Sequence, residues 1–452
     1  MPPSVVTAAG GGRRIVLAGA CLAMLAIGDN STAIMAALPA LARALGLACW
    51  ALEWAVNAYL LASASCIVLG GLFADRFGAK PSSAAGCALF GLASVVIALS
   101  PDAVLLLAGR ALQGLGAAFA VAGTLAVAGA TTAAARPAAI GAWTGFLMLG
   151  FSLGPLVGGF LTHTLGWEAN FWLNLPLMLA AAGLLLAPGA KDAAAADRHR
   201  VDWLGLLLLA GFMTALIVGL QALPEAAASP AAAALPLLIA AAALAALLVV
   251  EARTARPLVD LGFFARRRFA FAAAVLFFSM LNIMTLLLYY NLYAQGAGGL
   301  GYSPVGAGLS LLPLSLALFG VARAAPWLAA RFGLRLTMSA GGLLTVLGLF
   351  LVQRGVVGGG PVLAGVGLFV TGAGIALPYA SAPRVGLATL DQAQSGQGSG
   401  MLNSCSFLGG TVGVTAGGIA YGLAGFTGAL AVVAAAALAI AALSALYGAA
   451  TT

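Results

Sequence analysis

Two charged side chains lie inside long apolar stretches of this 452-residue chain, in which only 7% of residues are charged. Asp29 lies within IGDNSTAIMAALPAL, and Arg110 lies within LAGRALQGLG. A carboxylate in apolar surroundings can take up and release a proton, and a nearby guanidinium can influence that step. We therefore predict that Asp29 carries a proton and that Arg110 takes part in the coupling.

Structural roles are the alternatives for both residues. Asp29 and Arg110 could form a fixed ion pair, or Asp29 could be a hydrated residue at a cavity mouth. Arg110 could instead hold neighbouring helices by binding their backbone carbonyls. Glu53 lies only at the start of the second apolar stretch, and not within it.

Uncharged polar and aromatic side chains recur within the apolar stretches and are candidates for lining a central site. They offer hydrogen bonds and aromatic contacts with little charge, which suits a lipophilic solute that is neutral or weakly cationic. For any one of them, a contact between helices or a place in an interfacial belt is the alternative interpretation. The predicted substrate-binding residues are Asn57, Tyr59, Gln113, Asn174, Asn282, Tyr290 and Asn403; Trp143, Tyr289, Gln295 and Tyr379 have the same character.

The glycine-rich run GFSLGPLVGG lies inside another apolar stretch. Gly150, Gly154 and Gly158 are four residues apart, so on a helix they share one face that a second helix can approach closely. Pro155 interrupts the hydrogen-bond ladder of that helix, and Gly159 follows directly. Soluble helices rarely tolerate this combination, because an interior proline costs about 3 kcal/mol. The run predicts a tight contact between two helical bundles that takes part in conformational change.

The segment GLFADRFGAK places an acid, a glycine for chain reversal and two cations in one short turn. An acid beside the N-terminus of a partner helix would form a charge–dipole latch that favours one of two bundle arrangements. The alternative is a charged loop that only follows membrane topology. The predicted conformational residues of this turn are Gly71, Asp75, Arg76, Gly78 and Lys80.

The elements that position these residues must be membrane-spanning helices. The chain is 63% hydrophobic, and its mean hydropathy is +1.09. No soluble fold of this length carries such a composition. About fourteen apolar runs are each long enough, at about 20 residues, to cross a bilayer as a helix. The first run, from Ile15 to Pro39, is expected to be a retained span and not a cleaved signal.

The net charge of +8 is distributed in a way that indicates topology. Counted from Arg13 and Arg14, most lysines and arginines fall in alternate loops, as expected for cytoplasmic loops. An even number of spans with both termini in the cytoplasm satisfies this pattern. We expect a multi-pass protein of the inner (plasma) membrane, in contact with the lipid bilayer, without a nucleic-acid partner and with no obligate protein partner evident.

An internal repeat indicates two related halves. GLFADRFGAK aligns with PWLAARFGLR 255 residues later, and the same shift aligns Gly154 and Gly158 with Gly409 and Gly413. We therefore expect an all-α protein with two pseudo-repeated six-helix bundles and two inserted linker helices. The predicted divisions are residues 1–200 for the first bundle, 201–260 for the inserted pair and 261–452 for the second bundle.

Motifs for enzymatic chemistry and for cofactor binding are missing. The chain has no Walker A sequence, no nucleophile elbow, and only His163 and His199 as histidines. The five cysteines are scattered without disulfide or metal spacing. We expect no metal, no cofactor and no enzymatic activity, with a proton gradient as the energy source.

In combination these segments resemble the major facilitator superfamily, and within it the fourteen-span drug:proton antiporters. GLFADRFGAK is similar to that family's loop motif, RALQG from Arg110 to its proton-coupling motif, and GFSLGPLVGG to its antiporter motif. WAVNAYLL, FWLNLP, VDWLG, PLVDLGFF and GYSPVGAGLSLLP also resemble this branch, so the likeness covers nearly the whole chain. The family's usual acid in the first span falls at Asn30 in this chain, one residue after Asp29.

The expected function is secondary active export of small lipophilic or amphipathic compounds, antibiotics among them, in exchange for protons by alternating access. One alternative is a transporter of the same fold that exports a single endogenous metabolite or works without proton coupling. More distant alternatives are a membrane enzyme and a channel.

Overall fold

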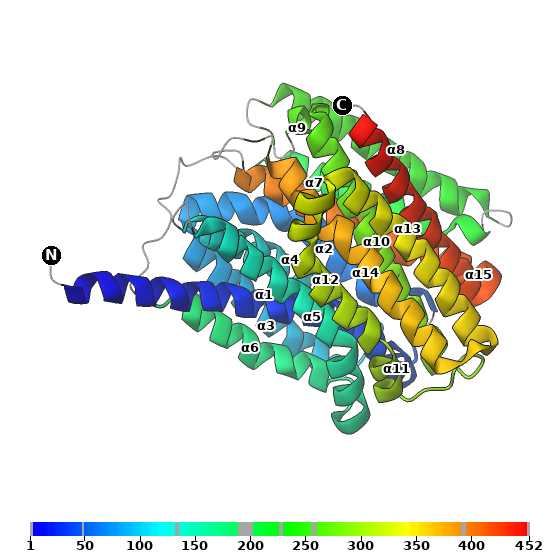
Figure 1. The fold of residues 1–452 in the computed structure, drawn as a ribbon. Coiled ribbons are helices and arrows are strands. Elements are labelled where there is room, and N and C mark those ends of the chain that lie inside the picture. The colour runs from blue at the N-terminus through cyan, green and yellow to red at the C-terminus, as the bar shows by residue number, and fades with distance from the viewer. Residues whose placement is uncertain are drawn as a thin grey trace.

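The computed structural model describes residues 3–47, 49–131, 135–188, 202–225, 229–254, 257, 260–388, 390 and 395–449. Within these ranges every regular element is helical and no strand occurs, which confirms the predicted all-helical class. Long helices run roughly side by side through the molecule, and the N-terminal helix projects from one end (Figure 1).

Six helices form the first group. α1 packs against α5 and α6, α2 packs against α4, and α3 packs against α4 and α6. The Asp102 side chain caps α4 by accepting a hydrogen bond of 2.9 Å from the backbone N–H of Leu105. The bounds are α1 Pro3–Leu45, α2 Cys49–Phe77, α3 Ala79–Ala98, α4 Ala103–Gly129, α5 Arg136–Leu165 and α6 Ala169–Leu185.

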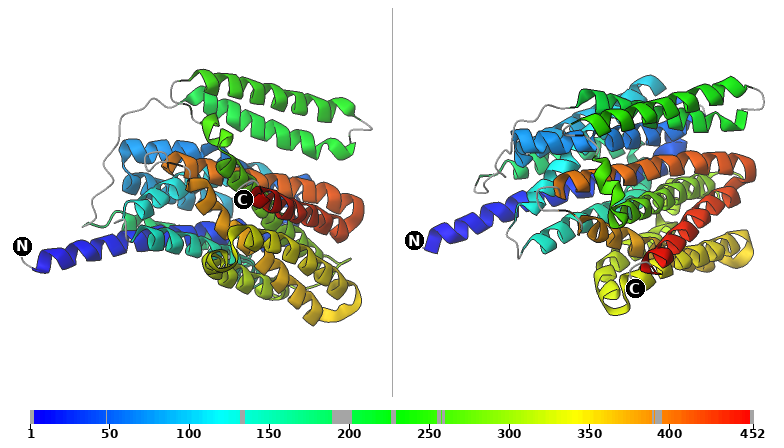
Figure 2. Two further views of the ribbon diagram at one scale, coloured as in Figure 1. Left: turned by 45° about the horizontal axis from the view of Figure 1, so that its top comes forward. Right: turned by 90° about the horizontal axis from the view of Figure 1, so that it is seen from above.

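Two helices follow as a separate pair. α7 (Trp203–Gln221) packs against α8 (Pro230–Arg253), with the short 3-10 turn η1 (Leu223–Glu225) after α7. The pair lies beside the main body, and α7 contacts α2 and α15 (Figure 2). These helices cover the residues that the sequence analysis assigns to two inserted spans, and their origin as an insertion between two halves stays a prediction.

The remaining helices form the second group. α10 packs against α15 and α14, while α14 also packs against α12 and α13. The backbone of α15 leaves helical geometry at Ala424 and at Gly425, whose φ is +60°. The bounds are α9 Leu261–Ala265, α10 Arg267–Gln295, α11 Pro304–Ser310, α12 Leu312–Phe332, α13 Leu334–Arg354, the π-helical turn η2 Gly355–Gly359, α14 Gly360–Leu387 and α15 Ser395–Ala449.

Among the described residues, 12 helices are long and apolar enough to cross a membrane. This number is lower than the fourteen runs that the sequence predicts, for two physical reasons. α15 is continuous as one 55-residue element despite its break at Ala424 and Gly425. α6 is apolar but has only 17 residues, from Ala169 to Leu185.

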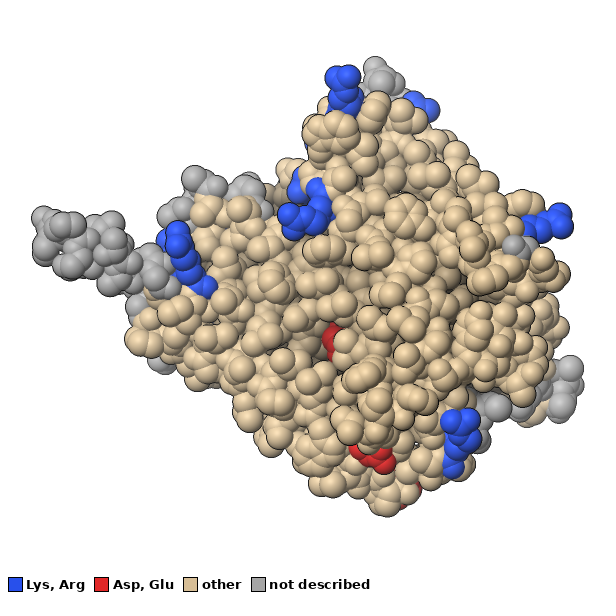
Figure 3. Space-filling model, turned by 60° about the horizontal axis from the view of Figure 1, so that its bottom comes forward, with Lys and Arg blue, Asp and Glu red and all other residues tan. Residues whose placement is uncertain are grey.

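Much of the outer surface is apolar. The most hydrophobic windows of α8 and α12 are only 17% and 28% buried, so their side chains face outward. Figure 3 shows one face on which uncharged residues dominate, with lysine and arginine side chains mostly toward its margins. Such a surface is stable in contact with lipid and not with water.

Candidate functional site

Asp29 lies in the part of α1 that α5 approaches most closely. Its side chain is 8% exposed, and no hydrogen bond or ion pair joins its carboxylate to another described residue. A Cβ added at Gly150 would lie 2.7 Å from the backbone N of Asp29, and one added at Gly154 would lie 2.7 Å from its backbone O. The two glycines therefore hold α5 directly against the backbone of α1 around this acid.

Arg110 is fully buried and is bound to groups other than Asp29. Its Nε donates to the backbone O of Ala55 at 2.7 Å, and Nη1 donates to Oε1 of Gln113. The guanidinium carbon lies 4.6 Å from the ring centroid of Tyr59, close enough for a cation–π contact. The structure therefore does not contain the fixed Asp29–Arg110 ion pair, and Arg110 ties α4 to α2 through a backbone carbonyl and a ring.

Asn30, the residue after Asp29, is the centre of an amide network. Gln113 donates from Nε2 to Asn30 Oδ1 at 3.1 Å and to Ser94 Oγ at 2.7 Å. Asn174 donates from Nδ2 to the same Asn30 oxygen at 2.9 Å. Because Gln113 also accepts from Arg110, the network joins α1, α3, α4 and α6. An asparagine at position 30 preserves these hydrogen bonds without placing a second negative charge beside Asp29.

Only part of the predicted substrate-binding set comes together. Tyr59, Gln113 and Asn174 belong to the surroundings of Arg110 and Asn30, with the Tyr59 hydroxyl accepting from Ser31 at 3.3 Å.

The other four predicted residues lie apart from this network. Asn57 donates to Thr415 Oγ1 at 3.1 Å across α2 and α15, Tyr290 donates to Ser310 Oγ at 3.0 Å, and Asn403 donates to Ser399 O of its own helix at 3.0 Å. Asn282 is fully buried in α10, and neither of its amide atoms has a hydrogen-bond partner within the described ranges.

The glycine run contacts other helices on two different faces. Gly150, Gly154 and Gly158 all face α1, where added Cβ atoms would meet Leu25 O, Thr32 Oγ1 and Ala33 O. The prediction that these glycines join two bundles is therefore wrong, because α1 and α5 belong to the same group of helices.

The contact with the second group comes from neighbouring positions of α5. A Cβ at Gly159 would meet the carbonyl of Pro304, and one at Gly308 would lie 2.5 Å from the carbonyl of Pro155. Ser152 donates to Ser315 O at 3.0 Å. The helix repeat is the reason, since a residue one position along faces about 100° away from the glycine face.

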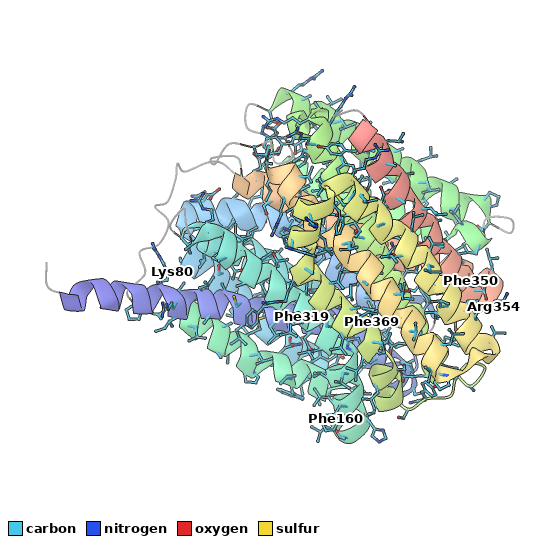
Figure 4. The ribbon with its side chains drawn as sticks, in the orientation of Figure 1. Lys80, Phe160, Phe319, Phe350, Arg354 and Phe369 are labelled. Carbon is cyan, nitrogen blue, oxygen red and sulfur yellow. The ribbon has the colours of Figure 1, made fainter. Side chains whose placement is uncertain are left out.

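The turn GLFADRFGAK links α2 to α3 through Gly78, whose φ is +100°. Lys80 donates to the carbonyl of Ala187 at 2.9 Å, so a cation lies at the C-terminal end of α6 (Figure 4). Arg76 lies 5.2 Å from the ring of Phe77, Asp75 is exposed, and a Cβ at Gly71 would meet open space. A latch at Asp75 remains a prediction.

At the opposite end of the molecule Figure 4 places Arg354 beside Phe350, with the guanidinium carbon 5.3 Å from the ring centroid.

Glu53 makes long-range contacts that the sequence did not reveal. Gln221 of α7 donates to its Oε2 at 3.1 Å, and the Tyr289 hydroxyl of α10 lies 3.3 Å from its Oε1. The only sequence signal is a carboxylate at the start of an apolar run, and it does not identify either partner. Within the described ranges no group of three or more His, Cys, Asp or Glu residues is placed to hold a metal ion.

Comparison with known proteins gives consistent results. The family described as Major Facilitator Superfamily matches residues 20–414. The cephamycin export protein CmcT of Amycolatopsis lactamdurans is 30% identical, over 87% of this chain and 82% of that protein. The tetracenomycin C resistance and export protein of Streptomyces glaucescens is 28% identical, over 89% and 75%. The crystal structure of the human organic anion transporter MFSD10 covers 98% of this chain and all of that chain with a TM-score of 0.65, at 18% identity, which supports the fold alone.

Substitution of Gly154 by alanine tests the contact between α1 and α5. The added methyl meets Thr32 and the backbone of Asp29 and Ala33, so α5 must move away from α1. We expect a loss of about 1–3 kcal/mol in stability, measured by thermal unfolding in detergent. Gly145→Ala is the control, because an added Cβ there meets no atom within 4 Å. Equal stability of the two variants would contradict the close approach.

Substitution of Gln113 by leucine tests the amide network. It removes the acceptor of Arg110 Nη1 and of Asn30 Nδ2, and the donor to Asn30 Oδ1 and Ser94 Oγ, while keeping a side chain of similar size. We expect a loss of at least about 2 kcal/mol, since each orphaned buried polar group costs about 1–3 kcal/mol. Gln353→Leu serves as the control because its bond to Thr427 is exposed, and a similar loss in both variants would argue against the network.

Proposed function

Because the chain belongs to the Major Facilitator Superfamily, we propose that it exports small lipophilic or amphipathic compounds, antibiotics among them, across the inner membrane in exchange for protons. Two of the similar proteins are described as exporting tetracenomycin C and cephamycin, and others as multidrug resistance proteins. These relatives are 28–30% identical, so they support a class of substrate and not one compound.

The observation that carries proton coupling is the environment of Asp29. It is a buried acid without a partner among the described residues, in a helix that spans the apolar region. A carboxylate tied into a fixed ion pair has a stabilised charge, whereas an unpaired one can change its protonation with its exposure to either side. Arg110 is held nearby in the network by Gln113 and Tyr59, and it provides a fixed positive charge in the same half.

In the proposed cycle Asp29 is accessible in turn from the outer side and from the cytoplasm. Protonation from the outer side favours release of the substrate, and loss of the proton to the cytoplasm favours loading. With one proton exchanged, export of a monovalent cation is electroneutral and export of a neutral compound moves net charge. Both termini are assigned to the cytoplasm, which follows from the distribution of lysine and arginine.

We further propose fourteen crossings in two six-helix bundles with α7 and α8 inserted between them. α6 is counted as a short span, and α15 is counted as two spans divided at Ala424 and Gly425. The divisions at residues 1–200, 201–260 and 261–452 follow this count.

The glycine contacts support the proposed repeat. A Cβ added at Gly409 of α15 would collide with the carbonyl of Phe277 in α10, and one added at Gly413 would lie 2.8 Å from the carbonyl O of Leu281. Gly154 and Gly158 of α5 face α1 in the same manner. Other pairs correspond too, since α3 packs on α4 as α13 packs on α14. Close α1–α5 and α10–α15 pairs are the arrangement that two structurally related bundles require.

Contacts between the two groups of helices support alternating access. Gln295 of α10 donates to the carbonyl of Ala36 in α1 at 3.0 Å, and Ser152 of α5 donates to Ser315 of α12. With the N-terminus in the cytoplasm, the Gln295 contact and the Gly159–Pro304 contact lie toward the outer side. We infer that this conformation is closed toward the outside and that transport requires these contacts to separate.

Replacement of Asp29 by asparagine tests the proposed coupling. In proteoliposomes with an imposed pH gradient, the wild-type protein should accumulate ethidium against its concentration gradient. Asp29→Asn should reduce gradient-driven accumulation to the level of protein-free vesicles, because asparagine keeps the size but cannot carry a proton. Exchange of ethidium down its own gradient should persist, which separates coupling from folding.

The matched control is Asp102→Asn, since asparagine also caps a helix and Asp102 lies outside the proposed site. Gradient-driven accumulation by Asp29→Asn at the wild-type rate would exclude Asp29 as the coupling residue. ATP-dependent movement would contradict secondary transport, and unsaturable conductance under voltage would favour a channel.

A further inference from the structure

Glu53 is an acid at the junction of three parts of the chain. It lies near the start of α2, and its partly exposed side chain meets α7, α10 and α15. The proton cycle proposed at Asp29 does not use it. The inserted helices α7 and α8 also have no role in that cycle, although α7 directly contacts this acid through Gln221.

The contacts of Glu53 are made by its two carboxylate oxygens. Oε2 accepts from Gln221 Nε2 at 3.1 Å, and Oε1 lies 3.3 Å from the Tyr289 hydroxyl. That hydroxyl is held by a shorter bond of 2.6 Å to the carbonyl of Val414 in α15. Gly418 allows the approach, because a Cβ at that position would collide with Oε1. The carboxylate thus connects α2 with the inserted helix and with both helices of the α10–α15 pair.

The charge of Glu53 determines how strongly these contacts hold. The titratable groups that face it are Tyr289 of α10 and, behind that residue, Tyr421 of α15, whose ring centroid lies 5.3 Å from that of Tyr289. From α7 it meets the uncharged amide of Gln221. In the described part of the chain no lysine, arginine or histidine forms an ion pair with it. The single hydroxyl proton of Tyr289 is donated to Val414 O, so the donor that depends on the charge of Glu53 is the Gln221 amide. An ionised carboxylate accepts this donor strongly, whereas a protonated carboxyl loses its charge and one acceptor site.

We propose that Glu53, Gln221 and Tyr289 form an outer latch, and that a proton taken up by Glu53 from the outer side releases it. In the ionised state the carboxylate joins the outer ends of α2, α7 and α10 and favours the outward-closed conformation. Binding of one proton converts the carboxylate into a neutral acid, weakens its hydrogen bond from Gln221 and allows these ends to separate. Glu53 is in this account a positioning residue, and α7 is the element that moves with it. The role in transport rests on the alternating access proposed above.

The outer latch can be tested by distance measurement without any substrate. Spin labels at Arg43→Cys and Gly298→Cys, in a background with the five native cysteines replaced by serine, report the separation of the outer ends in lipid nanodiscs. Asp29→Asn is included in every sample so that Asp29 cannot contribute to the pH response. We expect the fraction with the longer distance to rise about fivefold between pH 8 and pH 5. A hydrogen bond to a charged acceptor is stronger than one to a neutral acceptor by an amount that corresponds to about this ratio.

Glu53→Gln in the same background should abolish this pH response, because glutamine retains hydrogen bonding but cannot titrate. Gln221→Leu should raise the longer-distance fraction already at pH 8, since α7 then loses its bond to the carboxylate. Glu168→Gln is the matched control, an acid outside the latch, and should behave like its parent. A pH response that persists in Glu53→Gln overturns the proposal, as does an unchanged fraction in Gln221→Leu, which can be tested even if Glu53→Gln does not fold.

These outcomes are separate from those of the transport assay. Coupled transport by Asp29→Asn would refute Asp29 as the proton carrier without affecting the label distances. A missing pH response in the labelled protein would refute the outer latch while leaving coupling at Asp29 intact.

Discussion

The close approach of α5 to α1 is the contact on which the candidate site depends. Gly150, Gly154 and Gly158 lack the Cβ atoms that would otherwise collide with the backbone of α1 between Leu25 and Ala33. Between apolar helices in lipid there is little hydrophobic driving force, so close van der Waals packing of this kind supplies much of the association energy. Asp29 lies within the contacted segment, so its position depends on the absence of a side chain at these three glycines of α5.

A second constraint is that polar groups inside the bundle must find partners within the protein. Arg110 meets this requirement at Nε through the Ala55 carbonyl and at Nη1 through Gln113, and its guanidinium lies over the Tyr59 ring, while Nη2 has no hydrogen-bond partner among the described residues. Asn30 meets it through Gln113 and Asn174. The network fixes α1, α3, α4 and α6 relative to one another while leaving the Asp29 carboxylate outside it. The residues of this network therefore have a structural role. Within this site the titrating role is proposed for Asp29 alone, which has no hydrogen bond to the network.

Two contacts toward the outer side, one at Gly159 and one at Glu53, have different chemistry. Gly159 and Pro304, with Pro155 and Gly308, meet through backbone, so this contact responds to helix position and not to pH. Glu53 meets Gln221 and Tyr289 through side chains whose interaction depends on charge. At this second place α7 contacts Glu53 of α2, and through that residue it is connected with α10.

The sequence by itself determined the helical membrane class, the family and a glycine face suited to close helix contact, because hydropathy, charge and four-residue spacing are local properties of the chain. It also identified Asp29 as a buried acid, since a charge within an apolar run needs no partner to be recognised. The tertiary structure alone decided that the glycine face meets α1 and not the second bundle, that Arg110 binds Gln113 in place of Asp29, and that Glu53 reaches Tyr289, 236 residues away. Partners across helices depend on the rotation and depth of each helix, and those are fixed by packing of the whole bundle and not by any one segment.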